Sequence, residues 1–216
     1  MIKRRFFLGA AGAAAGTAAI ATATGGFIAG GERRAPDGVA VSGRGGIPNV
    51  PLLTHEGKDV LFYDDQVKGK TVLISFIYTR CADLCPLNVA MFKRVYGLLG
   101  DRMGKDVFFN TITLDPRNDT AQILGAYARA FEAGPGWSFL TGTLESTETL
   151  RKSFGFVDPD PVLDANKELH MGMCWLGHEP LSRWSACPAM TKASAIARYI
   201  NWADPKGERP RQVLSA

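Results

Sequence analysis

The sequence predicts an α/β domain in which helices flank a central mixed sheet, with a hairpin extension near its C-terminal part. Apolar runs of strand length alternate with segments of helical periodicity, as expected for strands joined by crossover helices. The chain has 216 residues, 46% of them apolar and 21% charged, which fits one globular domain with appendages. Two strand-like segments surround a turn at 179–180 and predict the added hairpin. These features exclude a disordered chain and a multi-span membrane protein.

Residues 1–31 predict an export signal. Three consecutive basic residues, 3–5, precede a stretch that is uncharged and rich in Ala and Gly. The adjacent pair Arg4 and Arg5 resembles the twin-arginine signal, and small residues at 21–23 offer a cleavage site. The uncharged stretch is also long enough to cross about 30 Å of hydrocarbon, so an uncleaved anchor in the inner membrane stays open. In both cases we expect the domain in the periplasm.

The remaining chain divides into a flexible linker at 32–49, a structured domain at 50–203 and a polar tail at 204–216. The whole chain carries 25 basic and 21 acidic side chains. Without the three basic residues of the signal, 22 basic side chains remain against 21 acidic ones, and the net charge is +1. Such a domain has no positive field for a phosphate backbone, so we expect no nucleic-acid partner. Membrane contact is expected only through the N-terminal segment, if it is uncleaved.

The first predicted core strand, residues 72–79, leads directly to a cysteine motif. The strand is apolar nearly throughout, which is typical of a central strand covered on both faces. Pro86 suits the first turn of a helix, and periodic apolar residues continue that helix to Gly100. This places Cys85 at the helix N-terminus and Cys81 in the loop before it.

The later elements continue the alternation of strand and helix. Asp119 and Thr191 each suit the cap of a following helix. Ile123, Tyr127 and Phe131 recur at helical spacing and predict one face of the helix after Asp119. The other predicted elements are strands at 107–114, 137–141 and 169–176, a return strand after 179–180, and a helix at 144–154.

Cys81 and Cys85, with three residues between them, are the strongest chemical signal. The loop at the carboxyl end of a central strand is where α/β sheets place their sites. The partial positive charge of a helix N-terminus favours thiolate, which binds metals and attacks disulfides. A structural disulfide without turnover is the alternative that these residues leave open.

Three stretches resemble one known family, the Sco/SenC proteins. Residues 76–86 (FIYTRCADLCP) are similar to the family's cysteine signature, and residues 113–120 (TLDPRNDT) resemble its strand-to-helix segment. His170 lies 85 residues beyond Cys85, close to the spacing of the family's histidine ligand. The resemblance extends over about 49–202.

The resemblance implies a thioredoxin-like fold in which Cys81, Cys85 and His170 bind copper. It also implies a copper metallochaperone that assists assembly of the dinuclear copper centre of cytochrome c oxidase, with the copper-accepting subunit of the oxidase as its partner. The donors suit this role, since thiolates are soft ligands for Cu(I) and an imidazole helps to accommodate Cu(II). The same three ligands would also accept zinc.

Cys81 and Cys85 equally support an extracytoplasmic thiol-disulfide oxidoreductase that acts on client cysteines. One thiol would attack and the other would resolve, without any need for His170. A periplasmic thiol reductant would then be a second partner. This activity can accompany copper delivery as a secondary role.

Cys174 and Cys187 have no counterpart in the resemblance. A hairpin turn centred between residues 180 and 181 would place these two cysteines opposite each other. We therefore predict a cross-strand disulfide between them, which requires that their Cα atoms come within about 7 Å.

Five further residues are weaker candidates. His55 and His178 are expected in exposed or polar turns and not as ligands. Met171 and Met173 flank the His170 position and are either soft copper donors or core residues. Asp115 follows a predicted strand and either tunes the site or turns the chain.

Overall fold

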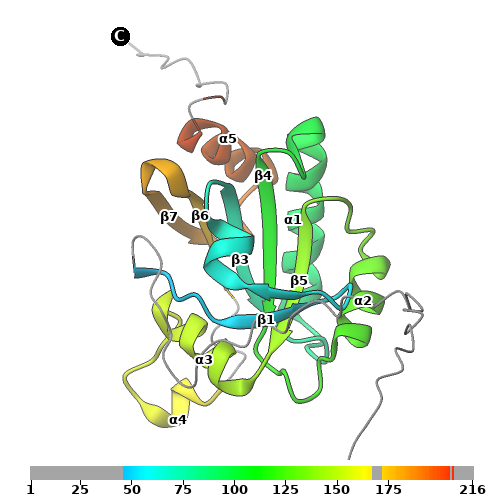
Figure 1. Ribbon diagram of the computed structural model, residues 1–216, viewed down its shortest axis with the longest axis vertical. Helices are drawn as coiled ribbons and strands as arrows, with labels where there is room; N and C mark the ends of the chain where they lie inside the picture. The colour runs from blue at the N-terminus through cyan, green and yellow to red at the C-terminus, as the bar shows by residue number, and fades with distance from the viewer. Residues whose placement is uncertain (1–45, 167–171, 205, 207–216) are drawn as a thin grey trace, which may run out of the picture. The chain divides into compact units, whose positions relative to one another are not determined.

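A seven-stranded mixed sheet, in the order β2-β1-β5-β4-β3-β6-β7, forms the centre of the domain (Figure 1). The structure is a computed structural model that describes residues 46–166, 172–204 and 206. The expected signal, most of the expected linker and His170 lie outside these residues. The strands are β1 (Pro51–Thr54), β2 (Asp59–Leu61), β3 (Thr71–Ile77), β4 (Val107–Thr113), β5 (Trp137–Gly142), β6 (Met173–His178) and β7 (Arg183–Pro188).

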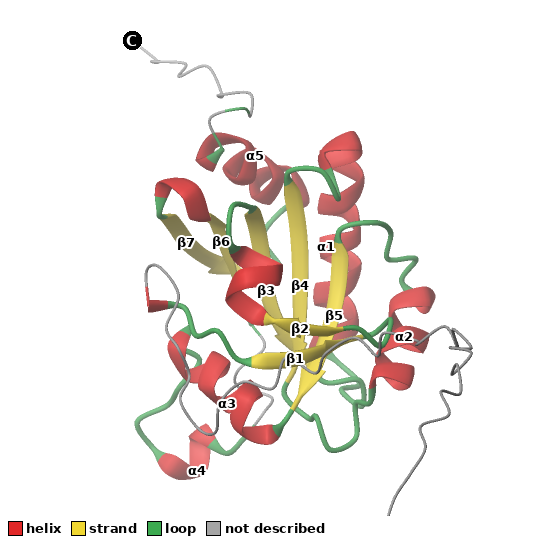
Figure 2. Ribbon diagram, viewed as in Figure 1, coloured by secondary structure: helices red, strands yellow, loops and turns green. Residues whose placement is uncertain are grey.

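Helices cover both faces of this sheet, as predicted (Figure 2). The α-helices are α1 (Leu84–Leu99), α2 (Ala121–Ala130), α3 (Leu144–Ser153), α4 (Pro161–Asp164) and α5 (Ala193–Ala203). A π-helical segment, η2 (Phe62–Val67), precedes β3, and short 3-10 turns η3 (Gly100–Arg102) and η5 (Glu179–Leu181) follow α1 and β6.

The parallel strands β3, β4 and β5 form the core of the sheet. The three strands follow one another across the sheet in chain order, from β3 to β4 to β5. Right-handed crossovers between them therefore place α1 and α2 on the same face of the sheet. Tyr96 of α1 accordingly stacks on Trp137 of β5, with ring centroids 5.9 Å apart. On the opposite face, Phe76 of β3 packs against Phe154 and Phe156, which follow α3. All seven residues of β3 are buried, as expected from its apolar sequence.

The predicted C-terminal hairpin is confirmed. β6 pairs antiparallel with β3 on one side and with β7 on the other. Cys174 lies directly opposite Cys187 across β6 and β7, which is the register that the turn at 180–181 predicts.

Both predicted helix caps are wrong. The cap of α2 is Thr120, whose hydroxyl accepts the Ile123 N–H at 3.3 Å. Asp119 instead accepts hydrogen bonds from groups on two other segments. α5 begins after Lys192 without a side-chain cap, so Thr191 lies one position too early.

The predicted apolar face of α2 is also rotated. Leu124 and Ala128 are buried, whereas Ile123 is 44% exposed. Tyr127 and Phe131 are half-buried and contact each other, with ring centroids 4.9 Å apart. The buried face of α2 therefore runs through Leu124 and Ala128, one residue along from the predicted row that includes Ile123.

The hairpin of β1 and β2 has no strong signal in the sequence. Its strands have four and three residues, too few to establish an alternating pattern. The β1 strand forms because it pairs antiparallel with β5, which is far away in sequence. The short helix α4 is likewise unpredicted, although Asp160 caps it and Pro161 occupies its first turn.

Gly136 is a position where a side chain cannot be accommodated. Its φ is +81°, and an added Cβ would lie 2.3 Å from the backbone nitrogen of Gly104. We expect Gly136→Ala to lower the free energy of unfolding by about 2–4 kcal/mol, because backbone strain and a backbone clash add. Chemical denaturation measures this change.

Gly155 provides the matched control for Gly136. It has a similar φ of +75° but no atom within 4 Å of an added Cβ. Gly155→Ala should therefore cost only the left-handed strain of about 1 kcal/mol. Equal losses of unfolding free energy in the two variants would contradict the predicted clash between residue 136 and the backbone of Gly104.

Within the part of the chain that the structure describes, no helix is both long and apolar enough to cross a membrane.

Candidate functional site

The fold brings Cys81 and Cys85 together at the carboxyl end of β3. Cys81 lies in the loop after the strand, and Cys85 lies in the first turn of α1. Cys85 is fully buried and Cys81 is 8% exposed. The backbone N–H of Cys85 donates to Cys81 Sγ at 3.4 Å. These placements agree with the positions predicted from the strand and from Pro86.

The sulfur of Cys81 takes the place of a helix cap. Asp83 occupies the cap position of α1 but makes no capping hydrogen bond with its side chain. Backbone N–H groups of Cys85, Asp83 and Leu84 interact with the Cys81 sulfur instead. Free N–H groups in the first turn of a helix stabilise a negative charge, so this arrangement favours the thiolate of Cys81.

The two thiols consequently differ in acidity. Burial opposes ionisation of Cys81, but the N–H groups of Cys85 and its neighbours outweigh it and lower the pKa of Cys81. Burial raises the pKa of Cys85 well above that of an ordinary thiol, and the neighbouring Cys81 raises it further. The pair thus combines a slightly exposed thiol whose ionisation is favoured, Cys81, with a fully buried thiol that stays protonated, Cys85.

This asymmetry predicts selective alkylation of the metal-free, reduced protein. Iodoacetamide should modify Cys81 at least about tenfold faster than Cys85 at neutral pH, since the thiolate is the reactive form. Peptide mapping by mass spectrometry after short exposure measures both rates. In denaturant the difference should vanish, and equal labelling of the folded protein would contradict the assignment.

Asp119 fixes the loop that carries the cysteines. This fully buried carboxylate accepts hydrogen bonds from the Thr79 N–H at 3.0 Å, from the Thr79 hydroxyl and from the Thr113 hydroxyl. It therefore ties the segment that follows β3, and that leads to Cys81, to the end of β4. Sequence reasoning assigned Asp119 to a helix cap and missed this role. Thr79 is 40 residues away in sequence, and Thr113 belongs to the preceding strand.

Asp115 supports the same end of the sheet. Its carboxylate accepts from Arg80 at 2.8 Å and from Asn118 at 2.9 Å, and its carbonyl oxygen accepts the Asn118 and Asp119 N–H groups. Of the two roles expected for Asp115, the structure therefore shows the turn of the chain.

A tyrosine hydroxyl completes the surroundings of the thiols. Among the described residues, the Tyr127 hydroxyl is buried and has no hydrogen-bond partner. Burial raises the pKa of Tyr127, and the nearby Cys85, Cys81 and Asp119 raise it further, so the hydroxyl remains protonated beside them. Sequence analysis placed Tyr127 on a helix face and did not foresee its proximity to the cysteines.

The third expected ligand, His170, lies outside the described residues, as does Met171. Within those residues, no group of three or more Cys, His, Asp or Glu side chains is arranged to hold a metal ion. Met173 begins β6 and is 37% exposed. The described part of the site is therefore a dithiol.

His55 and His178 have structural partners. His55 lies in the turn after β1, as predicted, and accepts the Phe139 N–H at 3.2 Å. The exposed turn expected for His178 is wrong. His178 is the last residue of β6, is half-buried, and lies 2.9 Å from the Thr71 hydroxyl. Burial lowers the pKa of both imidazoles, which makes the neutral form the stable one.

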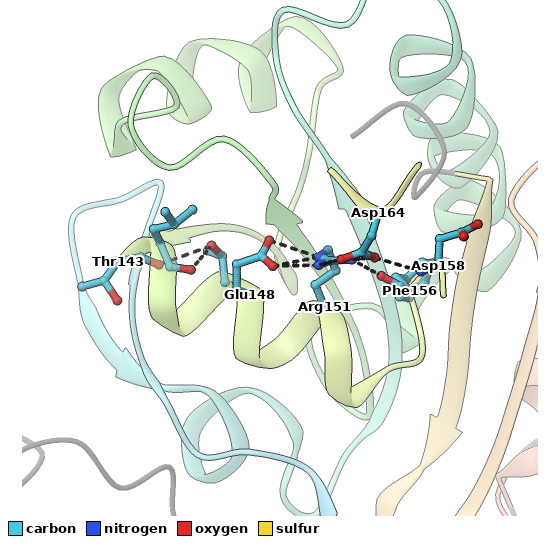
Figure 3. A network of polar contacts seen from close by, with 8 residues as sticks. Thr143, Glu148, Arg151, Phe156, Asp158 and Asp164 are labelled. Carbon is cyan, nitrogen blue, oxygen red and sulfur yellow. Dashed lines mark hydrogen bonds and ion pairs between the residues drawn. The ribbon is translucent and has the colours of Figure 1, made fainter. Parts of the chain in front are cut away.

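A buried arginine organises the chain between α3 and α4 (Figure 3). The Arg151 side chain is only 4% exposed and lies between the carboxylates of Glu148 and Asp164, at 2.7 Å from each. It also donates to the Phe156 carbonyl, and Asp164 accepts the Asp158 N–H at 2.9 Å. The hydrogen bonds that Arg151 donates to Asp164 and Glu148 raise the pKa of Arg151, so it stays charged. This network anchors the segment that precedes residues 167–171.

Comparison with known sequences identifies relatives of this domain. The sequence model described as SCO1/SenC matches residues 51–170. Protein sco1 of Schizosaccharomyces pombe is 33% identical over 103 residues, which cover 48% of this chain and 38% of that protein. The chain spans about half, or less, of the length of the curated relatives it matches.

Solved structures share the fold. The copper-bound ScoI of Bradyrhizobium japonicum has a TM-score of 0.56 and 23% identity, covering 71% of this chain and 96% of its own. BsSco is described as a cytochrome c oxidase assembly protein with a disulfide switch. It has a TM-score of 0.55 and 23% identity, covering 73% of this chain and 92% of its own. These likenesses confirm the predicted thioredoxin-like architecture.

Proposed function

Because the chain belongs to the SCO1/SenC family, we propose that it is a copper metallochaperone which binds copper through Cys81, Cys85 and His170. The copper-accepting subunit of cytochrome c oxidase, at the dinuclear copper centre, is the proposed recipient. The observation that carries this proposal is the pairing of Cys81 and Cys85 at the N-terminus of α1. There the Cys81 sulfur accepts the Cys85 N–H at 3.4 Å.

The chemistry of this pair supports copper as the cargo. Two sulfur donors on one turn of chain can bind a soft ion such as Cu(I), and a histidine would extend the site to Cu(II). The N–H groups around the Cys81 sulfur lower the pKa of Cys81 and so favour the thiolate, which is the form that binds a metal ion. His170 precedes β6 by three residues, and β6 pairs antiparallel with β3, the strand that ends at the cysteine loop. That topology is compatible with His170 as the third ligand.

We propose the periplasm as the location, with residues 1–31 as a twin-arginine signal or inner-membrane anchor. Residues 32–49 then act as a linker to the domain at 50–203, followed by a tail at 204–216. Asp204 itself is buried and pairs with Arg102, so the polar tail would begin beyond it.

Thiol-disulfide exchange is the second candidate function, and one observation favours it. The lowered pKa of Cys81 and the raised pKa of Cys85 are those of an attacking and a resolving thiol. A periplasmic thiol reductant would regenerate the pair. This function needs no His170.

Copper titration separates the two candidates. The reduced full-length protein is titrated with Cu(I) and with Cu(II), beside His170→Ala and the control His55→Ala. Copper delivery predicts about one ion per chain and a thiolate-to-Cu(II) charge-transfer band that disappears only in His170→Ala. Disulfide reduction of insulin that His170→Ala leaves unchanged, without stoichiometric copper binding, would instead establish the oxidoreductase.

A further inference from the structure

A second pair of cysteines lies outside the site described above. Cys174 of β6 and Cys187 of β7 occupy directly opposed positions of the antiparallel hairpin. The disulfide predicted between them is not formed in the structure, where the two sulfur atoms of the free thiols lie 3.5 Å apart. Opposed residues of such a ladder have Cα atoms about 4.5–5.5 Å apart, within the range that a disulfide requires. The sulfurs need to approach by only about 1.5 Å to reach the length of an S–S bond. Side-chain rotation therefore suffices to close the bond.

The two sulfurs differ in accessibility. Cys174 is fully buried, because β6 lies between β3 and β7 and is covered by α5. Cys187 is half-buried on β7, which is one of the two edge strands of the sheet among the described residues. A molecule that approaches from solvent can therefore reach Cys187 but not Cys174.

Hydrogen bonding adds a difference in reactivity. The thiol of Cys174 and the side chain of Thr191 lower the pKa of Cys187, although burial opposes the change. The same interaction with Cys187, together with burial, raises the pKa of Cys174. Of the two thiols, Cys187 is thus the one whose ionisation is favoured.

We propose that Cys174 and Cys187 form a second redox-active dithiol, distinct from Cys81 and Cys85, that exchanges with external disulfides. The Cys187 thiolate attacks one sulfur of the external disulfide, and the other sulfur leaves as a thiolate. Cys174 then attacks Cys187 Sγ in the mixed disulfide, which releases the second external sulfur. The external disulfide gains two electrons, the pair loses two electrons and forms the Cys174–Cys187 bond, and the protons of the pair pass to the released thiolates.

The full-length Cys81→Ser/Cys85→Ser protein tests this proposal without interference from the first pair. The reduced protein is mixed with oxidised glutathione, acid-quenched at intervals and mapped by mass spectrometry. We expect a glutathione adduct on Cys187 to appear first and to convert into the Cys174–Cys187 disulfide. Adding Cys174→Ala should trap the adduct on Cys187. Adding Cys187→Ala should leave Cys174 labelled at least about tenfold more slowly.

Thr191→Val tests the activation of Cys187 without removing either sulfur. It should slow capture of glutathione by Cys187 in the folded protein and have no effect in denaturant. Two results would overturn the proposal: both thiols stay alkylatable after equilibration with oxidised glutathione, or Cys174 in the folded protein captures glutathione as fast as Cys187. The quenched time course of the protein with both thiols present gives the order of attack even if an alanine variant folds poorly.

Discussion

Replacing Cys85 by serine is expected to weaken Cu(I) binding by about a thousandfold or more. Structural metal sites bind with about 10–16 kcal/mol, so loss of one ligand among three or four costs on the order of 4 kcal/mol. Serine keeps the size of the side chain and removes the soft donor. Because residue 85 is fully buried, no other sulfur can take the position of the lost one. Competition with a Cu(I) chelator of known affinity measures the change.

Cys187→Ser provides the matched control, because it removes a sulfur from another part of the sheet. It should leave Cu(I) affinity within a factor of about two, since Cys187 interacts with Cys174 and Thr191 and not with the first pair. A Cys85→Ser protein that still binds one Cu(I) with unchanged affinity would refute the proposed ligand set.

Replacing Arg151 by leucine is expected to destabilise the domain by about 3 kcal/mol. The guanidinium is buried and bridges Glu148 and Asp164, so its removal leaves two carboxylates and the Phe156 carbonyl without this donor. The cost lies below that of a fully buried pair because both carboxylates retain some exposure. For a domain of this size, thermal unfolding should shift downward by about 6–12 °C.

The adjacent Lys152 is exposed on the same helix and serves as the control for Arg151. Lys152→Leu introduces the same side chain and should change stability by less than about 0.5 kcal/mol. If both variants unfold at the wild-type temperature, the network in Figure 3 contributes nothing measurable to folding.

Local pattern was sufficient to place the cysteine site. The apolar run that becomes β3, followed by Pro86 in the first turn of α1, positions Cys81 and Cys85 correctly. The hairpin turn likewise sets the pairing of Cys174 with Cys187, since register follows from turn geometry. These features depend on residues close together in sequence.

The roles that sequence could not supply depend on partners far away along the chain. Asp119 resembles a helix cap locally, yet its hydrogen bonds go to Thr79 and Thr113. His178 stands next to turn-forming residues in sequence, yet the pairing of β6 with β3 places it beside Thr71. Arg151 has the spacing of an ordinary surface residue of α3, and its burial depends on the chain folding back at α4. His170 stays a prediction as a ligand.

The unequal depth of Cys81 and Cys85 imposes an order of events on this site. A ligand that approaches from solvent meets the Cys81 sulfur first, because Cys81 is 8% exposed and Cys85 is fully buried. In the proposed copper complex, release would therefore begin at Cys81, and the burial of Cys85 would set how long the ion stays bound.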